Sequence, residues 1–414
     1  MRHAIIGAGP SGVIAAETLR AQDPEAEIVL LGEEAEPAYS RMAIPYLLAG
    51  QIDEPGTYLR HTPGHFEKLA IRCVQDRVCA IDTDSRRLSL KKGGSLDYDR
   101  LLIASGSRPV KPPVTGLDQT AIHHCWTLED ARQIAQYTVA GSRVVLMGAG
   151  FIGSIIMEAL VRQKVRLTVV EMADRMVPRM MDQTAGNLIK QWCVDRGVDV
   201  RTSTMVKAVK PDLSGRARYL LETDTAVEIP ADLVVVATGV RPSIEFLEGS
   251  AIETRQGVIV DEYLQTSVAG IYAAGDVCEG VDWSTGDRAV HAIQPVAAET
   301  GRLAALNMSG CKTAHSGSLG MNVLDSIGLI STSYGQWQGN ERGDGAQLLD
   351  ESRYKYIKLQ FEEDRLIGAI TLGFTEHVGV LRGLIQSRVK LGEWKQRLIR
   401  DPSRMMEAYL ANTQ

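Results

Sequence analysis

The first twelve residues constrain the fold more than any other stretch of the chain. A short apolar run, 4–6, leads directly into Gly7-x-Gly9-x-x-Gly12, and a helical pattern of apolar residues follows. In this order the first glycine allows a tight turn, the second lets the backbone approach a pyrophosphate, and the third lets helix and strand pack closely. A second apolar run, 28–31, leads to Glu33, where a carboxylate can meet a ribose hydroxyl. The stretch predicts a site for NAD or FAD, and an ordinary turn of an α/β unit is the alternative.

The same order of elements recurs in the middle of the chain. An apolar run meets Gly148-x-Gly150-x-x-Gly153, a helical pattern follows, and the next apolar run, 167–170, ends in Glu171. The segments 101–109 and 231–242 also match, because each has an apolar run, a small-residue and glycine turn, and Arg-Pro. We therefore predict two related nucleotide-binding units.

Further polar residues point to the first unit. An apolar run that ends in Ala273-Ala-Gly-Asp276 delivers a carboxylate that needs a hydrogen-bond partner when it is buried, and a ribityl hydroxyl is suitable. Pro295 stands in the first turn of a predicted helix, whose N-terminus favours negative charge. In the loop after Glu33, Ser40 and Arg41 can reach the phosphates, although Arg41 is alternatively a solvated arginine.

The last hundred residues have a different pattern of apolar and polar residues. The segments 354–361 and 365–372 alternate as strands, a helical pattern runs from 377 to 398, and no glycine fingerprint occurs. This pattern predicts a third, antiparallel α+β domain for dimerisation or partner contact.

Composition narrows the functional classes. The 414 residues carry a formal net charge of −6, which does not favour nucleic acid or an anionic membrane as a partner. We expect no membrane span, no signal peptide and a cytoplasmic location. The six cysteines show neither CxxC nor zinc-type spacing, so we expect reduced, mostly buried thiols and no metal site.

The chain resembles the two-dinucleotide-domain flavoproteins of the pyridine nucleotide–disulfide oxidoreductase class. The resemblance rests on four stretches: the two glycine fingerprints, Ala237-Thr-Gly-Val-Arg-Pro242, and Ala273-Ala-Gly-Asp276. The resemblance covers nearly the whole chain. It implies an α/β fold of two Rossmann-like domains, one inserted in the other, and a C-terminal α+β domain. The implied bounds are 1–111 with 244–314 for FAD, 112–243 for NAD(P)H, and 315–414 for an interface domain.

The resemblance also implies roles for residues. Glu33 would bind the adenosine ribose of FAD, the backbone of Val78 would meet the adenine, and Asp276 would hold the ribityl chain. The helix after Pro295 would face the pyrimidine edge of the flavin. The candidate FAD contacts are Gly7, Gly9, Pro10, Ser11, Gly12, Glu33, Ser40, Arg41, Val78, Ala104, Ser105, Gly106, Arg108, Gly275, Asp276, Pro295 and Val296. The candidate NAD(P)H contacts are Gly148, Gly150, Ile152, Gly153, Glu171 and Gly239. Phe151 and Pro45 are the candidate catalytic residues, and Phe151 covers the flavin until nicotinamide arrives or simply packs.

Departures from the family pattern matter equally. Family members with redox-active cysteines carry one of two patterns in the loop and helix after the position of Glu33. One is CxxxxC, and the other is Cys-Gly-Leu-Pro-Tyr, as in CoA-disulfide reductase and NADH peroxidase. At the same place this chain reads Met42-Ala-Ile-Pro-Tyr46, so methionine replaces the cysteine. A thioether forms neither a thiolate nor a mixed disulfide, so we do not expect thiol chemistry at the flavin. Ile155 replaces the family glutamate that contacts nicotinamide. The loops most resemble the cysteine-free branch, which includes rubredoxin reductases and the flavin part of assimilatory nitrite reductase.

The leading hypothesis is an NADH-dependent FAD oxidoreductase that passes electrons to a separate carrier such as rubredoxin or ferredoxin. Glu171 favours NADH because it would repel the 2′-phosphate of NADPH, whereas Arg175 nearby weakens that preference. One alternative is an NADH oxidase or a small-molecule or polysulfide reductase. Another is an NADH-responsive redox subunit of a larger complex that docks through residues 317–414, and we expect a homodimer or such a subunit.

Overall fold

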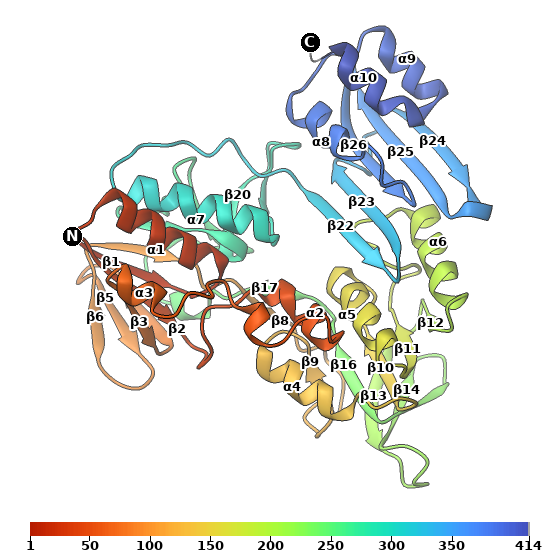
Figure 1. Ribbon diagram of the computed structural model, residues 1–414, viewed down its shortest axis with the longest axis horizontal. Coiled ribbons are helices and arrows are strands. Elements are labelled where there is room, and N and C mark those ends of the chain that lie inside the picture. Colours follow the sequence, from red (N-terminus) through yellow and green to blue (C-terminus); the bar gives the residue numbers. More distant parts are fainter. Residues whose placement is uncertain (413–414) are drawn as a thin grey trace. The chain divides into compact units, whose positions relative to one another are not determined.

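The computed structural model describes residues 1–412, and the chain forms two compact units (Figure 1). Unit 1 contains Met1–Ala43, Ile52–Arg108 and Val240–Ser318. Unit 2 contains Ile44–Gln51, Pro109–Gly239 and the chain from Leu319 onward. Each unit is therefore assembled from three separate stretches of sequence.

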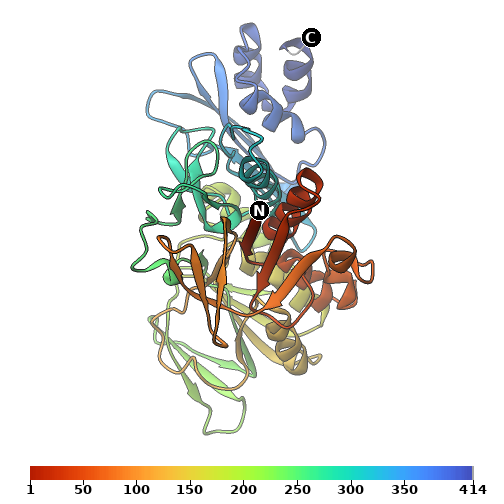
Figure 2. The same ribbon diagram turned by 90° about the vertical axis from the view of Figure 1, so that its left-hand side faces the viewer.

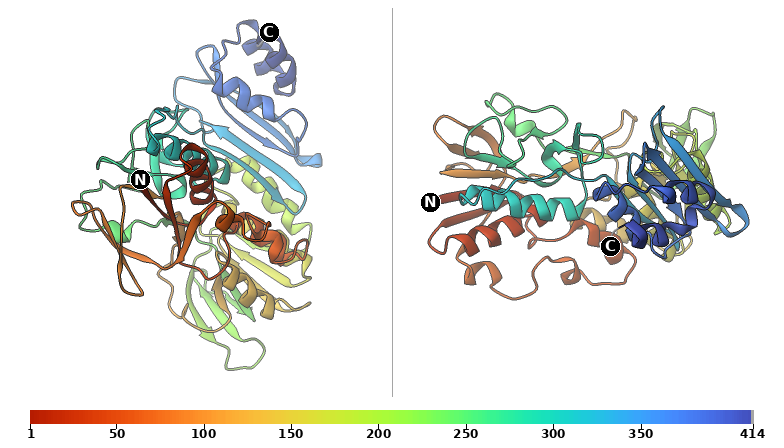
Figure 3. Two further views of the ribbon diagram at one scale, coloured as in Figure 1. Left: turned by 60° about the vertical axis from the view of Figure 1, so that its left-hand side comes forward. Right: turned by 90° about the horizontal axis from the view of Figure 1, so that it is seen from above.

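Unit 1 is built on a five-stranded parallel sheet of order β19-β7-β1-β2-β3. Its strands are β1 (Arg2–Ile6), β2 (Glu27–Gly32), β3 (Ile71–Gln75), β7 (Arg100–Ile103) and β19 (Ile271–Ala273). β1 and β2 are apolar along almost their whole length because helices and loops bury both faces of a parallel sheet. Helices α1 (Pro10–Gln22) and α7 (Gln294–Met308) lie side by side against it (Figure 3).

Unit 2 repeats this design. Its parallel sheet has the order β12-β11-β10-β16-β9. The run β16-β10-β11-β12 corresponds in sequence order and position to β7-β1-β2-β3 of unit 1. The strands are β9 (Ile122–His124), β10 (Arg143–Met147), β11 (Arg166–Val170), β12 (Asp199–Arg201) and β16 (Leu233–Val236). Its helices here are α2 (Ile44–Leu48), α4 (Leu128–Tyr137), α5 (Phe151–Arg162) and α6 (Gln183–Val194). The predicted pair of related α/β units is confirmed.

In each unit a three-stranded antiparallel meander precedes a strand of the parallel sheet, β7 in unit 1 and β16 in unit 2. In unit 1 the strands are β4 (Val78–Asp82), β5 (Arg87–Leu90) and β6 (Ser95–Asp97), drawn in orange in Figure 2. In unit 2 they are β13 (Val206–Pro211), β14 (Tyr219–Thr223) and β15 (Glu228–Ala231). The two Arg-Pro segments form a two-stranded sheet of β8 (Ser107–Pro109) and β17 (Val240–Pro242). The smaller elements of unit 1 are α3 (His65–Lys68), β18 (Val258–Ile259), β20 (Cys278–Val281) and β21 (Arg288–Val290).

An ion pair repeats with the fold at the N-terminal ends of the strands. The backbone N–H of Arg2 donates to Asp99 at 2.7 Å, and the backbone N–H of Arg143 donates to Asp232 at 2.9 Å. In each case the aspartate precedes the neighbouring strand, β7 or β16. The repeat therefore extends beyond the glycine turns to the opposite edge of each sheet.

The C-terminal part of unit 2 is the predicted antiparallel α+β structure (Figure 1). Its sheet has the order β22-β23-β26-β25-β24, from β22 (Met321–Ser326), β23 (Leu329–Gly335), β24 (Asp344–Asp350), β25 (Lys355–Glu362) and β26 (Arg365–Leu372). Helices α8 (Gly379–Gln386), α9 (Glu393–Arg400) and α10 (Met405–Asn412) follow.

β3 pairs in parallel with β2 and so belongs to the core sheet, although only Ile71 of its five residues is buried. One detail differs from the sequence prediction. The cysteines are free, but Cys73, Cys79 and Cys311 are exposed because they lie on an edge strand, a meander and a helix end; only three cysteines are buried. Among residues 1–412, no helix has the length and apolar character needed to cross a membrane.

Candidate functional site

The glycine turn of unit 1 brings strands and a helix within backbone contact. Gly7 has a φ of +114°, and a Cβ at this position would lie 2.1 Å from the carbonyl oxygen of Ala104 on the strand segment beside it. A Cβ on Gly12 would lie 1.9 Å from the carbonyl oxygen of Gly7. A Cβ on Gly9 would meet no atom within 4 Å. Two glycines are thus required by packing, and the third exposes the backbone.

The turn of unit 2 has the same geometry. A Cβ on Gly148 would lie 2.5 Å from the carbonyl oxygen of Ala237, and one on Gly153 would lie 2.1 Å from that of Gly148. Gly150 is again open, because a Cβ there would meet no atom within 4 Å. The N-termini of α1 and α5, which begin at these turns, have no side-chain cap. Their free backbone N–H groups suit a phosphate.

The candidate residues of unit 1 gather at the carboxyl edge of its sheet. Gly7–Gly12 follow β1, Ala104–Arg108 follow β7, and Gly275 and Asp276 follow β19, and these three strands are neighbours. A Cβ on Gly275 would lie 3.2 Å from the Cβ of Ser11, so the first turn of α1 and the segment after β19 are in contact. The buried hydroxyl of Ser11 has no hydrogen-bond partner among residues 1–412.

Asp276 supplies a partly buried carboxylate at this edge. It lies in the 3-10 turn Gly275–Val277, and one carboxylate oxygen accepts a hydrogen bond of 2.8 Å from Ser107 Oγ. Burial raises the pKa of Asp276, while the Ser107 hydrogen bond and the charge of Arg41 lower it in part. A partly buried carboxylate with one side-chain donor has capacity for a further hydroxyl donor.

The N-terminus of α7 is exposed and has no side-chain cap. Pro295 stands in its first turn, next to Val296, as predicted. Gln294 is joined to the loop before α2, because Ser40 Oγ donates to its side-chain oxygen at 2.6 Å. Thr300 accepts the backbone N–H of Gly275 at 3.0 Å. These contacts bring the helix, Ser40 and the Asp276 turn into one cluster.

Glu33 and Val78 are also neighbours. Arg77, which precedes Val78, lies 3.4 Å from the Glu33 carboxylate at the end of β2. Glu33 is 60% exposed at its side chain, whereas Val78 is buried in the meander. The pair therefore offers one exposed acid and one backbone segment near the end of β2.

Two arginines predicted near the cofactor are engaged by acids. Arg41 lies 2.6 Å from Glu34 and donates to Tyr39 Oη at 3.1 Å, so it is not simply solvated. Arg108 forms an ion pair with Glu245, whose carboxylate also lies 3.7 Å from Arg241. Ser105 donates to the backbone oxygen of residue 243 at 2.9 Å.

In unit 2, the candidate NAD(P)H residues meet at the corresponding edge. Glu171 accepts the backbone N–H of Ala149, inside the glycine turn, at 2.7 Å and that of Ala173 at 2.8 Å. Arg175 donates to the carbonyl oxygen of Met181 at 3.0 Å and pairs with Asp174 at 2.7 Å. The acid is therefore held at the turn, and the arginine is held by its own loop. Gly239 follows β16, beside the same turn.

Phe151 and Ile152 are the first residues of α5, and both are partly buried. Pro45 lies in α2, which packs against α5 within unit 2. Met42 belongs to unit 1 and is 43% exposed. The thioether therefore occupies an accessible position where the cysteine-containing members have their thiol.

Four of the six cysteines are poor nucleophiles, because burial raises their pKa. Burial raises the pKa of Cys278, the cysteine nearest in sequence to Asp276, to about 12, and that of Cys193 to about 12. Burial also raises the pKa of Cys125 and of Cys73. A thiol with a raised pKa is protonated at neutral pH and does not attack a disulfide. This supports a packing role for Cys278.

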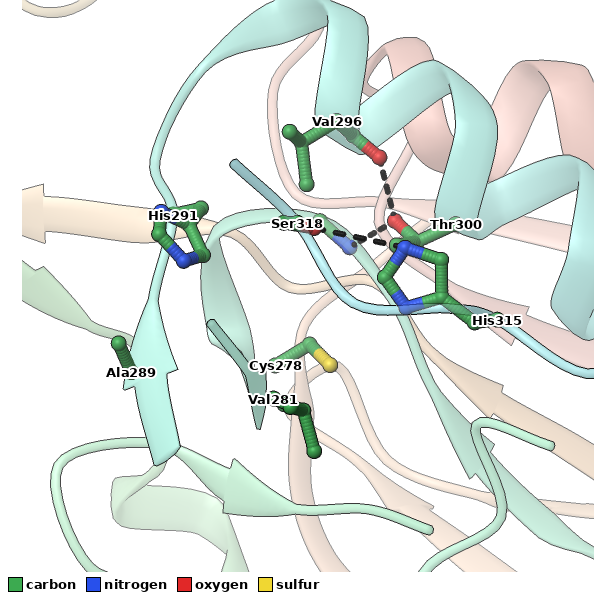
Figure 4. A pocket seen from close by; sticks show the side chains of 10 residues that line it. Cys278, Val281, Ala289, His291, Val296, Thr300, His315 and Ser318 are labelled. Atoms are coloured by element: carbon green, nitrogen blue, oxygen red, sulfur yellow. Dashed lines mark hydrogen bonds between the residues drawn. The ribbon is translucent and has the colours of Figure 1, made fainter. Parts of the chain in front are cut away.

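A small pocket lies behind the Asp276 turn (Figure 4). It is lined by residues that include Cys278, His291, Val296, Thr300 and His315. Its volume of about 10 Å³ accommodates about one water molecule and no cofactor ring. Two of the FAD candidates, Gly275 and Val296, line this pocket, but it is too small to hold a cofactor ring. Among residues 1–412, no cluster of three or more His, Cys, Asp or Glu residues suits a metal ion.

Sequence reasoning missed three residues of this cluster: Ser107, Gln294 and Thr300. Each acts through a contact distant in sequence, so no local motif marks it. A comparison of the two repeats would have singled out Ser107, since the corresponding residue is Val240.

The residues present fit two dinucleotides. At the carboxyl edge of each sheet lie a glycine with open space beside it, a helix N-terminus without a side-chain cap, and an acid after the second strand. Unit 1 also has Asp276 and the Ser11 hydroxyl, which has no hydrogen-bond partner among residues 1–412. This is the donor and acceptor set that phosphate and sugar hydroxyls require.

Comparisons with known proteins agree. Residues 1–295 match the family described as pyridine nucleotide-disulphide oxidoreductase, and residues 321–389 match the rubredoxin NAD+ reductase C-terminal domain. The chain is 29% identical to NADH-dependent phenylglyoxylate dehydrogenase subunit epsilon of Aromatoleum evansii, over 97% of this chain and 95% of that protein.

Two further comparisons concern a sequence relative and a solved structure. The ferredoxin–NAD(+) reductase component of the biphenyl dioxygenase system of Paraburkholderia xenovorans is 33% identical, over 66% of each chain. The crystal structure of the covalent putidaredoxin reductase–putidaredoxin complex has a TM-score of 0.91 at 24% identity, covering 100% of this chain and 99% of that one, which establishes the fold. The chain thus belongs to the pyridine nucleotide–disulphide oxidoreductase family and is an FAD-dependent NAD(P)H oxidoreductase.

Proposed function

We propose that the protein takes electrons from NADH and passes them through FAD to a separate one-electron carrier of the rubredoxin or ferredoxin type. The observation that carries the proposal is the exposed Met42, which stands in place of the family cysteine. In addition, burial raises the pKa of four of the cysteines that the chain does have. Because position 42 carries a thioether in place of a thiol, electrons leave from the flavin itself. The named relatives include a ferredoxin reductase component.

Residues 1–111 and 244–314 are assigned to FAD. The backbone at Gly9 and the N-terminus of α1 bind the diphosphate, Glu33 binds the adenosine ribose and Asp276 binds the ribityl chain. The uncapped N-terminus of α7 stabilises negative charge on the flavin pyrimidine. When it is bound, FAD supplies the conversion between two-electron and one-electron transfer.

Residues 112–243 are assigned to NADH, and residues 315–414 to partner contact. Glu171, fixed by two backbone N–H groups, is an acceptor for the ribose hydroxyls and disfavours a 2′-phosphate. Arg175 is held by Met181 and Asp174, so it does not counter this preference. Phe151 and Pro45 are assigned to the nicotinamide step.

The test is anaerobic stopped-flow reduction by NADH, followed by mixing with rubredoxin, ferredoxin, a disulfide or oxygen. We expect fast reoxidation by an iron–sulfur or rubredoxin-type carrier and slow reoxidation in air. Efficient two-electron turnover of a disulfide would contradict the thiol-free mechanism, and fast reoxidation in air would establish the oxidase alternative. A faster flavin reduction by NADPH than by NADH would overturn the nucleotide preference.

A second candidate is a redox subunit of a larger complex. It is favoured by the match to subunit epsilon of phenylglyoxylate dehydrogenase, because that match covers nearly all of both chains. In this case the carrier domain belongs to a partner subunit, and residues 315–414 provide the contact. Size-exclusion chromatography of the protein coexpressed with the products of neighbouring genes distinguishes a complex subunit from a free homodimer.

A further inference from the structure

The internal repeat provides a built-in comparison for each residue at the FAD site. Ala104-Ser-Gly-Ser-Arg-Pro109 and Ala237-Thr-Gly-Val-Arg-Pro242 occupy corresponding positions, because β7 pairs with β1 as β16 pairs with β10. Within these six residues the repeats differ at two places. Ser105 and Thr238 both keep a hydroxyl, whereas Ser107 corresponds to Val240. Only the first unit therefore has a hydroxyl at this position.

The carboxylate that Ser107 contacts is likewise absent from the second unit. Asp276 stands three residues after β19, the strand that pairs with β7. The strand that pairs with β16 is β9, and three residues after it stands Thr127. Thr127 is the N-cap of α4, where its side chain accepts the N–H of Asp130. The position thus serves local structure in unit 2 and carries an acid in unit 1.

Ser107, which is buried, and Asp276, which is partly buried, form a pair from segments 169 residues apart. Ser107 is 8% exposed, and its Oγ donates to Asp276 at 2.8 Å. Among residues 1–412, Ser107 is the one hydrogen-bond donor that the structure gives to this carboxylate. One carboxylate oxygen is therefore committed to Ser107, and the other remains as an acceptor. A hydroxyl in this position fixes the rotation of the carboxylate and favours its ionised form.

We propose that Ser107 is a positioning residue that orients the Asp276 carboxylate toward the ribityl hydroxyls of FAD. The inference rests on the proposed role of Asp276. Unit 2 has neither member of the pair, which matches its assignment to a nucleotide without a ribityl chain.

The effects of burial and of nearby groups on Asp276 are separable. Burial raises its pKa, and the hydrogen bond from Ser107 and the positive charge of Arg41 oppose that rise. Loss of the Ser107 hydroxyl therefore raises the pKa of Asp276 further. A neutral acid is a weaker acceptor for hydroxyl groups than a carboxylate. The FAD affinity of a variant without the Ser107 hydroxyl therefore depends on pH in a range where the FAD affinity of the wild-type protein is constant.

The test is FAD affinity of the full chain between pH 5 and 9 with a matched pair, Ser107→Thr and Ser107→Val. These variants have the same shape, and only the first retains the hydroxyl. We expect Ser107→Thr to bind FAD nearly as wild type and Ser107→Val to bind on the order of tenfold more weakly at neutral pH, with recovery as the pH rises. Ser250→Ala, which removes another hydroxyl of unit 1 bonded to the backbone of Leu247, is the control for general destabilisation.

Two outcomes would overturn the inference. One is an equal loss for both variants without pH dependence, which indicates a packing role. The other is an undiminished effect of Ser107→Val in an Asp276→Asn background, since the serine then acts independently of the carboxylate. If Asp276→Asn alone binds FAD as wild type, the proposed role of Asp276 fails instead. Carboxyl NMR titration of the FAD-free protein then decides about Ser107: a higher pKa of Asp276 in Ser107→Val supports the pair, and an unchanged pKa rejects it.

Discussion

At the residue scale, neighbouring glycines in one turn serve different purposes. Gly12 is required because a side chain would overlap the carbonyl oxygen of Gly7, whereas Gly9 faces no protein atom. We expect Gly12→Ala to lower the stability of the FAD-free protein by about 1–3 kcal/mol through overpacking. We expect Gly9→Ala to change it by less than about 0.5 kcal/mol but to weaken FAD binding at least about tenfold. Thermal unfolding without FAD and fluorescence titration with FAD measure the two effects. Tight FAD binding by Gly9→Ala would show that the diphosphate does not bind at this turn.

Glu17 gives the protein a defined response to acid. Burial alone would raise its pKa, but hydrogen bonds from Arg60 and His65 outweigh burial and lower it. A carboxylate with a lowered folded-state pKa stabilises the protein above its unfolded-state pKa, and that contribution is lost as the pH falls through the folded-state value. We expect Glu17→Gln to be less stable than wild type at neutral pH, with the difference shrinking as the pH falls through the lowered pKa of Glu17. Thermal unfolding across this range checks it, and a constant difference would show that packing alone matters.

At the element scale, the repeated Arg–Asp pairs differ in strength. Arg143 contacts Asp232 with two side-chain hydrogen bonds of 2.9 and 2.8 Å, whereas Arg2 lies 3.4 Å from Asp99 and is more exposed. A bidentate, partly buried pair contributes more than an exposed contact. We expect Arg143→Ala to destabilise β10 and β16 by about 1 kcal/mol and Arg2→Ala to have almost no effect. Hydrogen exchange of the two sheets measures this, and equal effects would contradict the geometric argument.

The predictability of an element follows from its burial. β1, β2, β10 and β16 are continuous apolar runs beside glycine turns, so sequence alone located them. β24 was not recognised, because an edge strand with two exposed leucines, Leu348 and Leu349, shows no clear alternation. β9 has three residues, two of them histidine, and its place beside β16 depends on pairing from a distant segment. These two edge strands therefore lack a clear local signal in the sequence.

At the scale of the whole molecule, each unit carries its own glycine turn. The assignment of FAD to one and NADH to the other predicts that Gly150→Ala keeps FAD bound and slows its reduction by NADH. The reason is that Gly150 lies in the open turn of unit 2, whereas the FAD set lies in unit 1. Absorbance of the purified protein and stopped-flow reduction measure the two properties. Loss of FAD from Gly150→Ala with retained folding would reverse the assignment.

The sequence by itself determined the class of the protein, because glycine spacing, buried strands and acid positions are local properties of the chain. Two fingerprints, the repeated Arg-Pro segments and Met42 were sufficient for the fold, the family and the expectation of thiol-free chemistry. Only the tertiary structure decided which side chains support one another. Ser107 reaches Asp276, Glu171 binds the N–H of Ala149, and Arg175 turns into its own loop. These contacts join residues that are distant in sequence or depend on side-chain rotation, so no motif encodes them.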